Sequence, residues 1–223
     1  MPKSQLDEMS LRVQKVLNEF GTPPLAGTPL AKEGPLSPTP ETVLAMIMDA
    51  MIKSRPISHE LAQQTVRHLI EGGYHDINKL YNSTWEERTD VLREGGYNRY
   101  REQGATNLGA LAEFVQENYD GDLNNLLEEA QGQRSKVMTL MKEIKGVGDL
   151  AGEIFLDNVQ SVWPSMAPFI DSRSLKTAKE IGIGTDVEAI YEALNRDPVQ
   201  MSWFANGLSN VRLEHREQAI ESV

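Results

Sequence analysis

The segment 144–155 reads IKGVGDLAGEIF and places a Gly-Val-Gly turn between two stretches with helical spacing. Glycine adopts positive φ and lets another backbone come close, so Gly146 and Gly148 can reverse the chain while Val147 fills the gap between the helices. The amides of the turn would then point outward at a helix N-terminus, which favours an anion. Such a turn grips phosphate without reading a base. A plain tight hairpin between two helices is the alternative interpretation.

Asp171 is the second residue whose position suggests chemistry. It begins the sequence DSRSL, after a loop that contains proline and tryptophan. An aspartate at the start of a helix is a standard N-cap, because its carboxylate accepts hydrogen bonds from the first backbone amides. The glycine turn upstream adds a functional interpretation to this structural one, and both can hold at once.

The order of these segments resembles the helix-hairpin-helix DNA glycosylase superfamily, of which endonuclease III is a familiar member. A glycine hairpin, an apolar helix, a Pro/Trp loop and a hydrophobic residue followed by Asp occur in that order. Four further segments are similar to those of the family: ETVLAMIMDAMIKSRP (41–56), LREGGYNRYREQGATNL (92–108), YDGDLNNLLEEA (119–130) and WFANGLSNVR (203–212). The resemblance covers residues 41–212. It implies two helical lobes, with the hairpin and Asp171 bordering the cleft between them.

The resemblance also implies a catalytic role for Asp171. In this family the aspartate helps to expel a damaged base by stabilising the sugar as positive charge builds on it, and it can orient the attacking water. Bifunctional members carry a lysine two residues after the second glycine, where Leu150 stands in this chain. Leucine cannot form an imine. The resemblance therefore implies a monofunctional DNA N-glycosylase of base excision repair, without a Schiff-base lyase step.

Several residues correspond to positions that contact double-stranded DNA in the family. Gly96 replaces an intercalating leucine and leaves Tyr97 and Asn98 of that turn, while Met51 corresponds to a glutamine inserted beside the flipped base. A core methionine and a buried or half-buried tyrosine that closes a helix turn are the structural alternatives. The predicted DNA-binding residues are Gly146, Val147, Gly148, Lys145, Lys142, Arg173, Lys176, Lys53, Tyr97, Asn98 and Met51.

The net charge of the chain opposes DNA binding, although the distribution of charge is more favourable. The sequence has 22 Lys+Arg against 33 Asp+Glu, a formal net charge of −11, whereas duplex binding needs several basic residues near phosphates. Asp149 adds local repulsion just after the turn. Basic residues nevertheless flank the proposed contacts: Arg134, Lys136, Lys142, Lys145, Arg173, Lys176, Lys179, Arg93, Arg99, Arg101, Lys53 and Arg55. Ordinary solvated helix faces are the alternative interpretation.

The composition excludes several classes of site. There is no cysteine, which removes disulfides, Cys-ligated zinc and the iron–sulfur cluster of many endonuclease III relatives. The four histidines lack the spacing of a zinc site, and GIGT at 182–185 lacks the Lys-Ser/Thr of a P-loop. No metal, cofactor or protein partner is expected. The chain has no apolar run of membrane-spanning length and no secretory signal, so we expect a cytoplasmic protein that associates with the nucleoid when bound to DNA.

Hydrophobic periodicity predicts an all-α fold. Helices are expected over Leu6–Phe20, 41–52, 58–72, 84–95, 99–118, 121–131, 133–145, 149–159, 172–181, 186–195 and 199–219. Residues 21–40 hold six of the eleven prolines and predict an extended, semi-rigid connector. The predicted organisation is an N-terminal helix and connector (1–40) that pack with the second lobe, a helical barrel-like lobe (41–160) ending in the hairpin, and a lobe (161–223) carrying the Asp171 helix.

A non-catalytic helix-hairpin-helix protein that binds DNA is the rival to the glycosylase. The acidic net charge, Leu150, Gly96 and Asp149 favour this rival. A helical scaffold for protein interactions that does not touch DNA is a third hypothesis.

Overall fold

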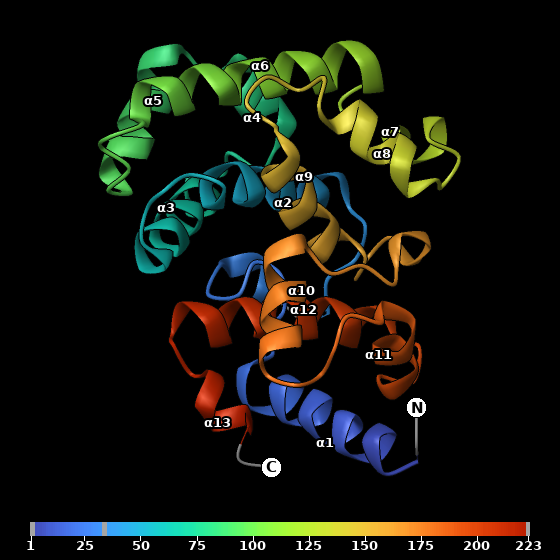
Figure 1. Cartoon of the computed structure of the whole chain (residues 1–223). Helices are drawn as coiled ribbons and strands as arrows, with labels where there is room; N and C mark the ends of the chain where they lie inside the picture. The colour runs from blue at the N-terminus through green and yellow to red at the C-terminus, as the bar shows by residue number, and fades with distance from the viewer. Residues whose placement is uncertain (1–2, 33–34, 222–223) are drawn as a thin grey trace. The chain divides into compact units, whose positions relative to one another are not determined.

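A computed structural model describes residues 3–32 and 35–221, and every regular element in these ranges is a helix (Figure 1). The predicted all-α class is therefore confirmed. The chain divides into two compact units, unit 1 (Met1–Pro24 and Leu156–Val223) and unit 2 (Leu25–Phe155). These limits differ from the predicted ones at residues 40 and 160.

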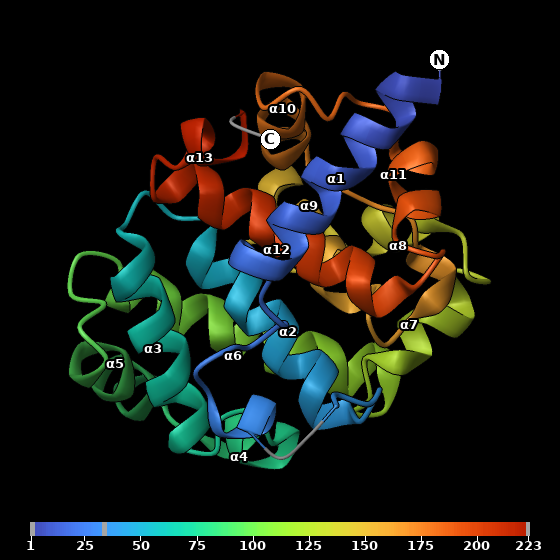
Figure 2. The same cartoon turned by 90° about the horizontal axis from the view of Figure 1, so that it is seen from below.

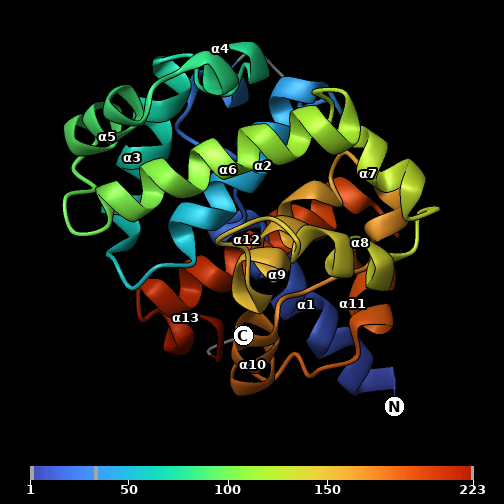
Figure 3. The same ribbon diagram turned by 90° about the horizontal axis from the view of Figure 1, so that it is seen from above.

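Unit 2 contains the central part of the chain. Its elements are η1 (Pro29–Lys32), α2 (Pro40–Lys53), α3 (His59–Glu71), α4 (Ile77–Asn82), α5 (Trp85–Glu94), α6 (Arg101–Tyr119), α7 (Asn124–Glu129), α8 (Arg134–Met141) and the start of α9 (Asp149–Val159). The long helix α6 packs against α4, α5 and α7 (Figure 3). Every residue from Thr42 to Ile52 of α2 is buried, as expected of a helix that is apolar almost all round.

Local capping sets where several of these helices begin. Ser58 accepts a hydrogen bond from the amide of Leu61 at the start of α3. A complete capping box between Thr84 and Glu87 opens α5. Helix α4 was not predicted, because its six residues are too few to show a period.

Unit 1 joins the two ends of the chain. Its elements are α1 (Lys3–Phe20), the end of α9, η2 (Pro164–Met166), α10 (Ser172–Glu180), α11 (Val187–Ala193), α12 (Pro198–Leu213) and α13 (Glu217–Glu221). Helix α1 lies across α12 (Figure 2) and also contacts α11 and α13. The helix predicted over 199–219 is in fact two helices, because the backbone reverses at His215, where φ is 55°.

Close backbone approach fixes the way in which α1 meets α12. A Cβ added to Gly207 would lie 3.1 Å from the amide nitrogen of Gly21, so only glycine lets the two backbones come this near. Asn210 donates hydrogen bonds to the carbonyl of Phe20 (2.9 Å) and to the hydroxyl of Thr22 (3.2 Å). The N-terminal helix is therefore an integral part of unit 1.

The proline-rich segment is more structured than the predicted extended connector. Leu25 and Thr28 are each only 2% exposed, and η1 packs on α3. The buried side chains anchor the segment that starts at Leu25 to unit 2.

Leu25→Ala is expected to lower the free energy of unfolding by about 2–4 kcal/mol, because it removes a buried side chain and leaves a cavity. Denaturant titration followed by circular dichroism measures the change. Leu36→Ala is the matched control, since Leu36 is only partly buried. Equal effects of the two substitutions would show that residues near Leu25 are a loose connector after all.

Candidate functional site

The predicted glycine hairpin lies between α8 and α9 (Figure 3). Gly146 has φ of 91°, in the left-handed region that favours glycine. Ile144 and Val147 are 1% and 6% exposed, so their side chains fill the inside of the turn. An added Cβ at Gly146 would overlap the side chain of Asn107, so α6 packs directly against the turn. The sequence analysis missed Asn107, because one polar residue on the apolar face of a helix carries no recognisable pattern.

The start of α9 leaves backbone donors without protein acceptors. Among the described residues, none accepts a hydrogen bond from the amides of Gly148, Asp149 or Leu150, and the first bond of the helix runs from Gly152 to the carbonyl of Gly148 (3.0 Å). Gly148 is exposed. Free amides at a helix N-terminus are the groups that bind a phosphate.

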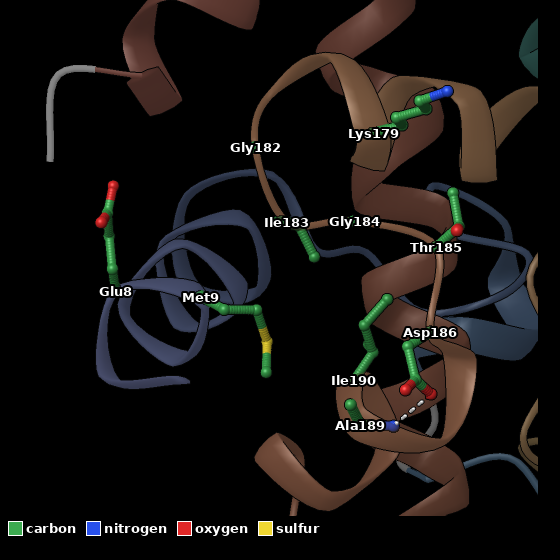
Figure 4. Close-up of a pocket in the computed structure, with 10 residues that line it drawn as sticks. All are labelled: Glu8, Met9, Lys179, Gly182, Ile183, Gly184, Thr185, Asp186, Ala189 and Ile190. Carbon is green, nitrogen blue, oxygen red and sulfur yellow. Dashed lines mark hydrogen bonds between the residues drawn. The ribbon is translucent and has the colours of Figure 1, made fainter. Parts of the chain in front are cut away.

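A second Gly-X-Gly turn lies between α10 and α11, and it differs from the first in how the following helix is capped (Figure 4). Gly182 and Gly184 have φ of 75° and 97°, and Ile183 between them is 6% exposed, like Val147. Here, however, Asp186 accepts a hydrogen bond from the amide of Ala189 (3.0 Å) and so caps α11 itself. The adjoining cavity of about 360 Å³ is lined by two acidic side chains and one basic one: Glu8, Asp186 and Lys179. This turn is therefore unsuited to an anion.

The basic residues near the first turn are only partly available. Lys142 forms an ion pair with Asp149, whose side chain is 80% exposed. Lys145 is exposed, and none of the described acidic residues forms an ion pair with it. An exposed ion pair exchanges readily with solvent and other ions, so Asp149 competes with a phosphate for Lys142 without blocking the amides.

Two of the predicted contact residues, Met51 and Tyr97, are buried side by side. They are 5% and 2% exposed and line a cavity of about 10 Å³ together with Arg55 and Asn107. That volume is close to the space that one water needs. Burial raises the pKa of Tyr97 to about 12, against a smaller opposing effect of Arg55, so its phenol is neutral at any physiological pH. These facts fit the structural alternatives given for both residues, and their contact with DNA stays a prediction.

The remaining predicted contacts lie in three separate places: the turn after α5, the end of α2, and α10. Asn98 is exposed after the Gly95–Gly96 turn. Lys53 pairs with Asp49 (2.8 Å), a carboxylate only 1% exposed, so its ammonium offsets a buried charge at the end of α2. Arg173 and Lys176 are exposed one turn apart on α10, and Lys176 lies 3.8 Å from Glu180. Their part in DNA binding also stays a prediction.

Asp171 is the N-cap of α10, as its sequence context predicts. Its Oδ1 accepts hydrogen bonds from the amides of Arg173 (2.9 Å) and Ser174 (3.1 Å). Within the described part of the chain, no donor reaches the second oxygen, Oδ2. The residue is 3% exposed. The cap thus uses one oxygen and leaves the other without a protein partner.

The hairpin turn and Asp171 belong to different units, unit 2 and unit 1 respectively. A shared cleft between them stays a prediction. Two polar side chains that the sequence analysis missed, Asp157 and Gln160, hold the backbone that leads to Asp171. They follow no sequence pattern, because they act through a few hydrogen bonds to the backbone of a loop.

The described residues contain no cluster of three or more His, Asp or Glu side chains placed to hold a metal ion. Of the described helices, none is both long and apolar enough to cross a bilayer.

Gly146→Ala is expected to destabilise the fold by about 1–3 kcal/mol, since alanine is strained at this φ and would displace Asn107. Gly148→Ala is the matched variant, because nothing lies within 4 Å of an added Cβ and the backbone needs no positive φ. Chemical denaturation compares the two. Similar losses would show that Asn107 does not constrain the turn.

The comparisons with known proteins concern the fold. Neither a family model nor a curated protein matches the sequence. Among solved structures, the chain is similar to H. pylori 3-methyladenine DNA glycosylase (MagIII) bound to 1,N6-ethenoadenine, with a TM-score of 0.54 and 13% identity over 95% of this chain and 98% of that one. Similarity at this level of identity establishes architecture, not activity. The chain therefore shares the all-helical fold of that solved structure.

Proposed function

We propose that this chain is a monofunctional DNA N-glycosylase of base excision repair, which removes a damaged or mispaired base from double-stranded DNA. The observation that carries the proposal is the geometry of Asp171, whose Oδ1 is held by two amides while Oδ2 has no donor among residues 3–32 and 35–221. The similarity of nearly the whole chain to a DNA glycosylase supports it. The substrate would bring the protein to chromosomal DNA.

The chemistry assigned to Asp171 is hydrolysis of a glycosidic bond. The target nucleotide is extruded from the duplex, since its anomeric carbon is inaccessible within the stack. As the bond from C1′ to the base nitrogen breaks, the base leaves with the electron pair and positive charge develops on the sugar. The carboxylate stabilises that charge, and its low exposure strengthens the interaction because little water screens it. Water adds to C1′, one of its protons passes to the base or to solvent, and an abasic site remains.

The hairpin supplies the grip on the strand. The amides of Gly148, Asp149 and Leu150 have no acceptor in the part of the chain that the structure describes and are suited to one backbone phosphate. Such contacts fix the register of the protein on DNA and carry no sequence information. Recognition of the base must then come from other side chains.

The absence of a lyase step follows from Leu150. A Schiff base needs an amine at this position, and Lys145 lies on the other side of the turn. Borohydride treatment during turnover is therefore expected to trap no covalent complex between protein and DNA.

A non-catalytic DNA-binding protein is the second candidate, and the burial of Asp171 favours it. A side chain that is 3% exposed and caps a helix has a complete structural role without any chemistry. This candidate keeps the phosphate grip and predicts salt-dependent duplex binding without turnover.

Asp171→Asn separates the two candidates. Asparagine is an equally good N-cap, so the free energy of unfolding and the duplex affinity are expected to stay unchanged, while base excision falls by about 100- to 1,000-fold. The assay measures abasic-site formation on a panel of duplexes with alkylated, oxidised, deaminated or mispaired bases. Excision by the variant at the wild-type rate would exclude Asp171 as the catalytic residue, and no excision by either protein would favour the binder.

Lys142→Gln tests the phosphate grip. Loss of one phosphate contact is expected to weaken duplex binding and to reduce the slope of log K against log salt by about 1. Asp149→Asn is the counterpart variant, since it frees Lys142 from its ion pair and is expected to raise affinity. Fluorescence anisotropy at several salt concentrations measures both. An unchanged affinity in both variants would show that DNA does not lie on this turn.

A further inference from the structure

Two buried side chains contact the loop that leads to Asp171. They are Asp157, near the end of α9, and Gln160, which follows it. They are 4% and 0% exposed. Burying a polar side chain is costly unless its hydrogen bonds are made. The hydrogen-bond partners of these two side chains therefore show which part of the backbone they fix. Both side chains have partners in the short segment before α10, Gln160 at Phe169 and Asp157 at Asp171.

Gln160 binds the backbone of Phe169 through both ends of its amide. Its Nε2 donates to the carbonyl of Phe169 (2.9 Å), and its Oε1 accepts from the amide of the same residue (3.0 Å). Nε2 also donates to the carbonyl of Asp157 (3.1 Å), which orients the glutamine itself. Paired bonds to one residue fix the backbone in both position and rotation, as a neighbouring strand would.

Asp157 binds the backbone of Asp171, two residues after Phe169. Its Oδ1 accepts a hydrogen bond from the amide of Asp171 (3.0 Å). The carboxylate of Asp171 is in turn bound by the amides of Arg173 and Ser174. The backbone amide of Asp171 is thereby bonded to a side chain of α9, and its carboxylate is bonded to amides of α10. These bonds fix the orientation of the second oxygen, Oδ2.

We propose that Asp157 and Gln160 are positioning residues that set the direction of the Asp171 carboxylate. The proposal deepens the function given above and rests on it for its kinetic consequence. Neither side chain needs to touch the substrate. Their effect is on the geometry of Asp171, and displacement of a reacting group by about 1 Å costs on the order of 100-fold in rate.

Hydrogen exchange at the amides of Asp171, Arg173 and Ser174 tests the constraint without DNA. Gln160→Leu and Asp157→Ala are expected to increase exchange at these amides, whereas Asp157→Asn restores protection, because its side-chain carbonyl can accept the same bond. Asn210→Ala is the matched control. It removes two hydrogen bonds elsewhere in unit 1 and leaves the three amides protected. Unchanged exchange in both Gln160→Leu and Asp157→Ala would overturn the proposal.

Single-turnover excision then tests the consequence for catalysis. Gln160→Leu and Asp157→Ala are expected to lower the rate by about 100-fold with duplex affinity unchanged, and Asp157→Asn to recover most of it. A loss of affinity with the rate preserved, or an equal loss of rate in Asn210→Ala, would contradict positioning and indicate general destabilisation. If the wild type excises no base, the proposed function fails while the exchange experiment still decides whether Asp171 is held.

Discussion

One helix N-cap constrains the rest of this site. Helix α10 begins with backbone amides that need an acceptor, and Asp171 supplies a single oxygen to two of them. The same bonds that begin the helix fix the carboxylate, so its structural role does not compete with a chemical one. The structural and functional interpretations of the sequence DSRSL are therefore compatible, because they use different oxygens of the same side chain.

The two Gly-X-Gly turns show that the glycines alone do not determine whether a turn can bind an anion. Both turns reverse the chain at positive φ and bury a β-branched residue, Val147 or Ile183. They differ in the aspartate that follows. Asp186 accepts from its own helix and closes that turn to anions, whereas Asp149 lies within α9 and pairs with Lys142, leaving the first amides free. The position of one carboxylate relative to the helix start thus separates a possible phosphate site from a structural turn.

Sequence patterns predicted the parts of the fold and site that depend on local chemistry. The hairpin, the largely apolar α2 and the cap at Asp171 each follow from residues close together in the chain. The supporting residues Asn107, Asp157 and Gln160 escaped prediction, because each is one polar side chain whose partner lies elsewhere in the chain or in a loop. The segment after Pro24 escaped for the same reason, since its prolines suggested an extended connector while the burial of Leu25 depends on tertiary packing.

The central claim of the proposed function is that Oδ2 of Asp171, which has no donor among the described residues, stabilises the sugar of an extruded nucleotide. A crystal structure of the Asp171→Asn variant with a lesion duplex that the wild type cleaves tests this directly. The account predicts the anomeric carbon in contact with the side-chain atom at position 171 that is not used by the cap, and a phosphate on the turn. A side chain still enclosed by protein, with the nucleotide elsewhere, would contradict it.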